Sequence, residues 1–188
     1  MEFKNLEKLT NIFINYSLDG VNLTLYKGDK PLIIDKSLRN IKSFLVFEEF
    51  IFFFMHLANR IVYVKLNEEK GILFQKEFLK IMFKSIEEIF YKNAPPERIY
   101  KFEDDFLKNL NKREIEYSTC KGLIDDKDFS LFNEHFNTSL INKFLYNIHI
   151  LLFEEIGLEP LMRLVLQKYI LELIKQNEIE VLILNFDS

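Results

Sequence analysis

The chain has few of the residues that build disulfides or glycine-based functional motifs. Its 188 residues include one cysteine, no tryptophan, five glycines and four prolines. Cys120 cannot form an intramolecular disulfide, so the sequence predicts a reducing compartment, the cytoplasm. No glycine-rich phosphate loop, Gly-x-Ser-x-Gly or Cys-x-x-Cys motif occurs. We therefore predict no catalytic residues, and the chain is not expected to be an enzyme or to hold a cofactor.

A concentrated basic segment is also missing. The 25 lysines and arginines are interspersed with 29 acidic residues, for a formal net charge of −4. Proteins that bind duplex nucleic acid or anionic membranes usually carry a concentrated basic surface. Neither partner is favoured, and a nucleic-acid-associated regulator would need a basic patch that only the folded chain assembles.

Long apolar stretches are present, but polar residues interrupt them. Residues 44–64 approach the length of a membrane span, and residues 140–156 are similarly apolar. The polar residues within the first stretch are Glu48, Glu49, His56, Asn59 and Arg60. Each ionised group at bilayer depth costs about 2–3 kcal/mol. We therefore expect no membrane span and interpret both stretches as buried helices.

Hydrophobic periodicity predicts a mainly α fold, a single-domain bundle of about six or seven helices that spans residues 1–188. With 48% hydrophobic residues, the chain is long enough to bury a core without a disulfide or a metal. Residues 43–66 are apolar over most of the helix circumference, which is typical of a helix enclosed by other helices. We expect this helix and residues 140–156 to form the centre of the bundle.

A small β-hairpin is predicted near the N-terminus. Residues 3–17 have apolar side chains at helical spacing, and Gly20 is expected to end that helix in a left-handed conformation. Alternating apolar and polar residues then predict a hairpin at about 21–34. Residues 180–186, rich in valine, isoleucine and leucine, could add a strand to this hairpin or could extend the last helix.

The remaining elements are predicted from capping and turn residues. Asp35 and Asn67 are expected to cap the central helix and the amphipathic helix that follows it. Pro96 is expected to lie at the start of a further helix. A short helix is expected to carry Phe129, Phe132 and Phe136. Residues 111–127, before that short helix, lack apolar periodicity, so we predict a long loop there.

One polar stripe on the central helix is the candidate site. At about 100° per residue, its seven side chains fall within roughly a third of the circumference. They are Glu48, Glu49, Phe52, His56, Asn59, Arg60 and Tyr63. Three interpretations stay open: a solvent-facing stripe, a buried network that fixes helix register, and a ligand site. The residues predicted for a ligand site are Glu49, Phe52, His56, Arg60 and Tyr63, because charged groups in a low dielectric bind polar parts of a ligand.

A metal centre is not predicted. Bundles that bind metals commonly use a Glu-x-x-His motif, and no such motif occurs here. The three histidines are His56, His135 and His149. Glu134 and His135 are adjacent, so they point to different faces of a helix. His149 lies on the apolar side of its predicted helix, and we interpret it as a core residue.

The predicted function depends mostly on what is missing. A helical chain without catalytic motifs and with surplus apolar residues often uses those residues to contact a partner. We predict a non-enzymatic cytoplasmic protein that acts through protein–protein contacts as a homodimer. The alternative is a bundle that binds a small hydrophobic or amphiphilic ligand, with or without catalysis, in an interior pocket lined by Glu49, His56 and Arg60.

Overall fold

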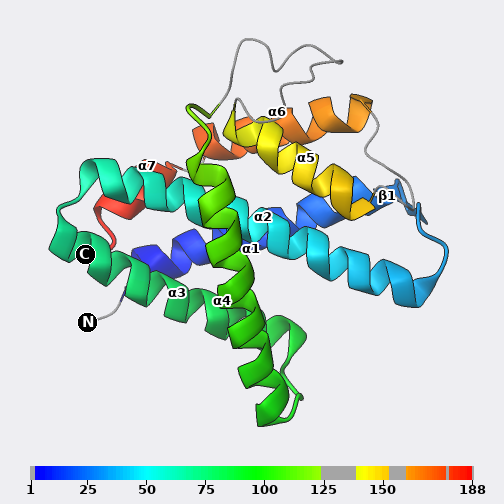
Figure 1. Ribbon diagram of the computed structural model, residues 1–188, viewed down its shortest axis with the longest axis horizontal. Helices are drawn as coiled ribbons and strands as arrows, with labels where there is room; N and C mark the ends of the chain where they lie inside the picture. The colour runs from blue at the N-terminus through cyan, green and yellow to red at the C-terminus, as the bar shows by residue number, and fades with distance from the viewer. Residues whose placement is uncertain (1–2, 124–138, 153–159, 177, 188) are drawn as a thin grey trace.

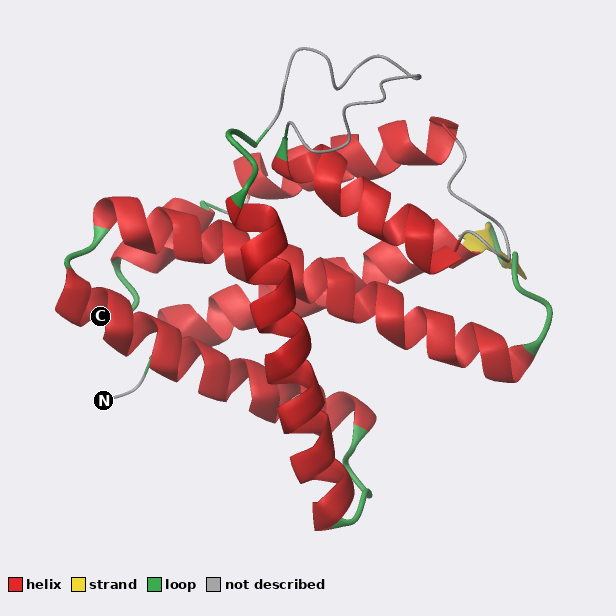
Figure 2. Ribbon diagram, viewed as in Figure 1, coloured by secondary structure: helices red, strands yellow, loops and turns green. Residues whose placement is uncertain are grey.

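The computed structural model describes residues 3–123, 139–152, 160–176 and 178–187. In these ranges the chain forms seven helices and a two-stranded antiparallel hairpin (Figures 1 and 2). The elements are α1 (Lys4–Leu25), β1 (Tyr26–Lys27), β2 (Lys30–Pro31), α2 (Lys36–Lys65), α3 (Glu68–Phe90), α4 (Pro96–Ser118), α5 (Leu140–Leu152), α6 (Pro160–Gln176) and α7 (Ile179–Leu184). The predicted mainly α fold class is confirmed.

The long helix α2 lies at the centre of the fold. Every residue from Val46 to Ala58 is buried, and α2 contacts α1, α3, α4, α5 and α7. Two of its aromatic rings pack on different neighbours. The ring centroid of Phe50 lies 4.8 Å from that of Phe144 in α5, and that of Phe52 lies 4.9 Å from that of Phe106 in α4. The prediction of an enclosed central helix is therefore confirmed.

The first helix continues through the start of the predicted hairpin. α1 ends at Leu25, and β1 and β2 contain two residues each, joined by a turn in which Gly28 has a φ of 62°. Val21, Thr24 and Leu25 are buried at helical spacing. Residues 21–25 thus fit both the alternating period of a strand and the period of a helix. Packing against the bundle favours the helix. The hairpin is confirmed as a small element but is shorter than the predicted 21–34.

Gly20 lies inside α1 and does not end it. A Cβ atom built at this position would lie 2.3 Å from Cζ of Phe50, so the glycine permits a close approach of α1 to α2. Thr24, one turn later, donates its hydroxyl to the Gly20 carbonyl at 2.6 Å, which satisfies a buried polar side chain within the helix. The predicted helix end was wrong because the glycine serves interhelical packing.

The expected helix starts are confirmed. Asp35 Oδ1 accepts a hydrogen bond from the backbone N–H of Leu38 at 2.7 Å, at the start of α2. Asn67 Oδ1 accepts from the N–H of Lys70 at 2.9 Å, at the start of α3. Pro96 is the first residue of α4. The Asp35 and Asn67 side chains each satisfy a backbone N–H that the helix itself leaves unpaired.

The predicted loop at 111–127 is wrong for residues 111–118, because α4 continues to Ser118. Apart from Ile115 these residues carry polar groups, and the contacts with α2 described below explain why the segment is helical. Residues 124–127 of that loop lie outside the described residues. So does the predicted short helix with Phe129, Phe132 and Phe136.

The C-terminal segment is helical and supplies no strand to the hairpin. α7 begins after Glu178, whose φ of 48° is in the left-handed region, and it packs against α1 and α2. Phe186 follows α7 and packs edge-on against Phe74 of α3, with 5.4 Å between ring centroids. Residues 180–186 therefore close the core on the side of α1 and α3.

The buried apolar residues of the described ranges form one continuous cluster with members from all seven helices. Within those ranges, none of the helices combines the length and the apolar character needed to cross a membrane. The assignment of residues 1–188 to one domain stays a prediction.

Candidate functional site

Helix α4 crosses α2 in Figure 1, and the two helices are in contact. The side chain of Glu49 is 2% exposed, and its carboxylate accepts three hydrogen bonds. Arg113 Nε donates at 2.7 Å, Asn147 Nδ2 donates at 2.9 Å, and the hydroxyl of Tyr117 donates as well. A buried carboxylate is costly unless it is paired and hydrogen-bonded. Glu49 is therefore the centre of a satisfied buried network that joins α2, α4 and α5.

The proton donors around Glu49 stay protonated near neutral pH. Burial raises the pKa of the Tyr117 hydroxyl well above its ordinary value, and the Glu49 charge adds to this effect. Burial alone would lower the pKa of Arg113, but Glu49 and Glu116 outweigh it and the net shift is upward. The Glu116 carboxylate accepts a second hydrogen bond from Arg113, at 2.8 Å. The Tyr117 hydroxyl and the Arg113 guanidinium therefore both remain hydrogen-bond donors to Glu49 near neutral pH.

A second set of bonds joins the C-terminal half of the stripe to α4. His56 Nδ1 lies 2.7 Å from Glu114 Oε2, and Asn59 Nδ2 donates to Glu114 Oε1 at 2.9 Å. Arg60 donates to the carbonyl oxygen of Cys120, just beyond α4. Within the described residues, Nε2 of His56 has no partner. The solvent-facing interpretation of the stripe is wrong for these side chains, and the contacts match the interpretation of a buried network that fixes register.

The structure brings four of the five predicted ligand-site residues together. Glu49, Phe52, His56 and Arg60 all lie on the side of α2 that α4 covers. Tyr63 does not join them, because it is 88% exposed. The Glu49 carboxylate, Nδ1 of His56 and the Arg60 guanidinium are hydrogen-bonded to other parts of the protein. A ligand role for these residues stays a prediction.

No apolar periodicity marks the α4 residues that complete this network. Arg113, Glu114 and Tyr117 lie in the segment predicted as a loop. Their spacing of one, three and four residues places them on neighbouring parts of one helical face. Matching polar faces, rather than apolar periodicity, is the signal that could have identified them.

Glu48 differs from its neighbour Glu49 in lacking partners. It is 7% exposed, and no hydrogen bond or ion pair to its carboxyl group is found in the described ranges. Burial raises the pKa of Glu48 to about 7, and the charges of Glu49 and Asp105 add to the shift. Glu48 lines a cavity of about 190 Å³ between α2 and α4, together with Phe52 and Asn109. Its carboxyl group is therefore half-protonated near neutral pH.

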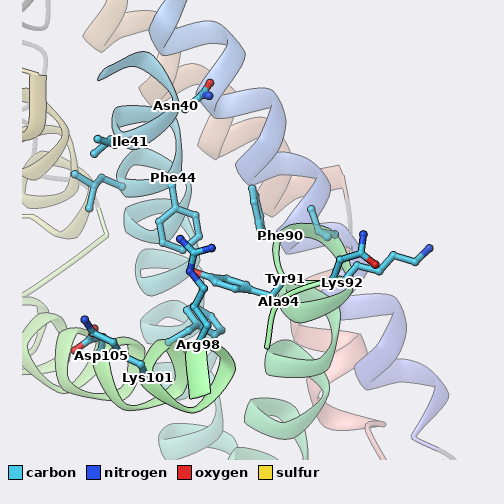
Figure 3. Close-up of a pocket in the computed structure, with 14 residues that line it drawn as sticks. Asn40, Ile41, Phe44, Phe90, Tyr91, Lys92, Ala94, Arg98, Lys101 and Asp105 are labelled. Atoms are coloured by element: carbon cyan, nitrogen blue, oxygen red, sulfur yellow. The ribbon is translucent and has the colours of Figure 1, made fainter. Parts of the chain in front are cut away.

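A larger surface groove lies among α2, the C-terminal end of α3 and the N-terminal end of α4 (Figure 3). We call it the α2–α3–α4 groove; its volume is about 960 Å³. Its aromatic wall consists of Phe44, Phe90, Tyr91 and Phe102. The centroids of Phe44 and Phe90 are 5.4 Å apart, and the stacked rings of Tyr91 and Phe102 are 4.7 Å apart. Apolar periodicity did not indicate this groove, because its rings come from α2, from the C-terminal end of α3 and the residue after it, and from α4.

Charged side chains surround the aromatic wall. Arg98 and Lys101 on α4, together with Lys92 before it, supply three positive charges, and Asp105 supplies one negative charge. In the described ranges none of these four side chains forms an ion pair. Figure 3 shows Arg98 extending toward Phe44 and the ring of Tyr91. The groove thus combines an apolar surface with unpaired positive charge.

The described residues contain no group of three or more His, Cys, Asp or Glu side chains that could hold a metal ion. Glu134 and His135 lie outside the described ranges. His149 is half-buried on α5, not in the core as predicted. Burial and the charge of Arg163 lower the pKa of His149, which favours the neutral imidazole near neutral pH.

Comparison of the chain with protein-family models, with curated proteins and with solved structures finds no match. The fold therefore defines only the class, a mainly α bundle.

Proposed function

We propose that this protein is a non-enzymatic cytoplasmic protein that acts through protein–protein contacts, and that the α2–α3–α4 groove is its contact surface for a partner. The observation that carries this proposal is the groove of about 960 Å³ with apolar side chains open to solvent. Ile41, Ile89 and Phe90 line it and are 56%, 47% and 40% exposed. Apolar groups gathered on a concave surface are typical of docking sites.

The buried network supports a structural role more than a ligand role. Glu49, His56 and Arg60 use their polar atoms to hold α4 and the segment after it against α2. A ligand would have to displace these contacts at the cost of leaving buried charges unpaired. The second candidate, binding of a small amphiphilic ligand, is favoured by one observation, the cavity of about 190 Å³ next to Glu48.

A homodimer is the second part of the proposal, and it would use a different surface. Val64, Ile72 and Val181 are 73%, 61% and 50% exposed, where the end of α2, the start of α3 and α7 meet (Figure 1). We call this surface the α7 end. Ion pairs cross it between Lys65 and Glu180 at 3.1 Å, and between Lys70 and Asp187 at 2.7 Å. Apolar groups with both signs of charge suit contact with a second copy about a two-fold axis.

The groove is tested by selection from a displayed library of amphipathic helical peptides. Binders are selected on the full chain and then counter-screened on Phe90→Asp, which places a charge on the apolar wall. We expect a family of binders that loses affinity for Phe90→Asp. Lys76→Asp, on an exposed part of α3 that does not line the groove, is the control and should bind them normally. Binders that are indifferent to Phe90→Asp would contradict the proposed contact surface.

A further inference from the structure

We propose that the α2–α3–α4 groove binds an acidic amphipathic helical segment of a partner protein. This inference rests on the proposed function, because it names the chemistry of the partner that the same groove receives.

The charge of the groove is positive, although the chain carries a net charge of −4. Lys92, Arg98 and Lys101 line the groove together with one carboxylate, that of Asp105, and none of the four forms an ion pair within the described ranges. Arg98 and Lys101 are three residues apart, so they extend from one face of α4. Unpaired charges beside a partner surface select partners of the opposite sign. The occupant is therefore expected to carry aspartate or glutamate at its edges.

The conformation of the occupant is set by the walls of the groove. The walls of the groove are α2, the C-terminal end of α3, the N-terminal end of α4 and the connecting residues 91–94. They offer no strand edge to an extended peptide. An occupant that covers an apolar wall must then satisfy its own backbone, and a helix does so. Its apolar side chains, spaced at i, i+3, i+4 and i+7, would contact Phe44 and Phe90.

Two other occupants fit the groove less well. A second copy of this chain would place one positively charged groove against another, which repels. An anionic membrane is flat, whereas these rings line a hollow, and surfaces that bind such membranes usually gather about four to eight basic residues. Three basic side chains beside a concave aromatic wall favour a protein segment.

The test uses the displayed library described above, with positions outside the apolar face randomised among acidic, basic and neutral polar residues. Binders that depend on Phe90 are sequenced, and their affinities are measured by fluorescence anisotropy. The test variant is Arg98→Glu/Lys101→Glu. The matched control is Lys76→Glu/Lys84→Glu, which makes the same change of charge at exposed positions of α3 outside the groove. Circular dichroism and thermal unfolding confirm that each variant is folded.

We expect enrichment of aspartate and glutamate, with affinity about tenfold or more weaker in the test variant and nearly unchanged in the control. Added salt should weaken binding to the wild type. Enrichment of basic or neutral residues, with Phe90-dependent binding that survives the charge reversal, would overturn the acidic partner and leave the proposed contact surface intact. Binders that never depend on Phe90 would overturn both. Phosphatidylserine vesicles that bind the wild type and not the test variant would identify a membrane site and refute the inference.

Discussion

Two adjacent carboxyl groups, those of Glu48 and Glu49, are buried in the same turn of α2 and differ in their hydrogen bonding. Glu49 is satisfied by three donors, whereas Glu48 lines a small cavity without a hydrogen-bond partner in the described ranges. Burial therefore raises the pKa of Glu48 from 4.5 to about 7. An unsatisfied buried carboxyl group is a local cost to stability that depends on pH.

Glu48→Gln should stabilise the fold at high pH. Between about pH 4.5 and 7 the folded wild type holds a proton on Glu48 that the unfolded chain has released. The free energy of unfolding of the wild type therefore decreases as the pH rises through this window. Above pH 7 the ionised group costs about 3 kcal/mol, at 1.36 kcal/mol per pKa unit. We expect the free energy of unfolding of Glu48→Gln, measured with urea, to exceed that of the wild type by about 1–3 kcal/mol at pH 8. At pH 4.5 the difference should be much smaller.

The control for this experiment is Glu88→Gln on α3, an exposed position. Its effect on the free energy of unfolding should be small at both pH values, because surface substitutions rarely exceed about 0.5 kcal/mol. A difference between Glu48→Gln and the wild type that is the same at both pH values would show that folding does not raise the pKa of Glu48.

Gly20→Ala is a second test at a single residue. The added methyl group would meet three ring atoms of Phe50 at 2.3–2.6 Å. That ring is fully buried and is held between Phe54 and Phe144, with centroids 6.1 and 4.8 Å away, so it cannot move freely. We expect a loss of about 1–3 kcal/mol in the free energy of unfolding, although alanine favours helix formation.

Gly71→Ala makes the same chemical change in α3, where the nearest atom is Cγ1 of Val62 at 3.4 Å, an ordinary contact. Here the helix propensity of alanine should dominate and stabilise the fold by about 0.5–1 kcal/mol. Opposite signs for the two glycines in thermal unfolding would support close packing of α1 on α2. Stabilisation by Gly20→Ala would contradict it.

At the scale of helices, the sequence predicts apolar faces well and polar faces poorly. The enclosed part of α2 and the caps at Asp35 and Asn67 follow from local residues, and the structure confirms them. The end of α4 does not, because residues 111–118 bury polar groups against a polar stripe on another helix. Apolar periodicity in the sequence reports on the buried face of one helix at a time. Such a face becomes visible only when its partner, 50 or more residues away, is considered with it.

The pair of Glu49 and Arg113 should be strongly coupled across the α2–α4 interface. Arg113→Met leaves the buried Glu49 carboxylate without its cation and should cost about 2–4 kcal/mol in the free energy of unfolding. Adding Glu49→Gln removes the buried charge and retains an acceptor for Tyr117, so it should recover part of this loss. A double-mutant cycle by urea unfolding should give a coupling of about 1–3 kcal/mol.

Arg98→Met is the matched control, because it removes an arginine from an exposed part of the same helix that makes no ion pair in the described ranges. Its cost should stay near or below about 0.5 kcal/mol. If the cycle gives additive effects for Glu49 and Arg113, the contact seen between them does not hold α4 in place.

At the scale of the whole molecule, the two proposed contact surfaces differ in what the sequence could reveal about them. The α2–α3–α4 groove combines residues from three helices, among them Ile41 and Phe44 of α2, Phe90 of α3 and Arg98 of α4. Within its own helix, each of these residues looks like an ordinary surface or boundary residue. The apolar and basic groups come together only where the three helices meet. This is a basic patch that only folding assembles, although it is too small to favour nucleic acid.

The homodimer should form through the α7 end and not through the groove. Multi-angle light scattering should give a mass near twice that of the 22.6 kDa chain. Ile72→Asp and Val181→Asp each place a charge on the exposed apolar surface of the α7 end and should shift the mass to that of a monomer, because such interfaces depend on desolvated apolar contact.

Two controls locate the interface. Ile115→Asp changes an isoleucine of α4 that is 71% exposed, and Phe90→Asp changes the groove, and both should stay dimeric. A monomeric wild type at micromolar concentration would refute the homodimer. A dimer lost in Phe90→Asp but retained in Val181→Asp would instead place the second copy in the groove, because the new charge would weaken a contact that covers the apolar wall.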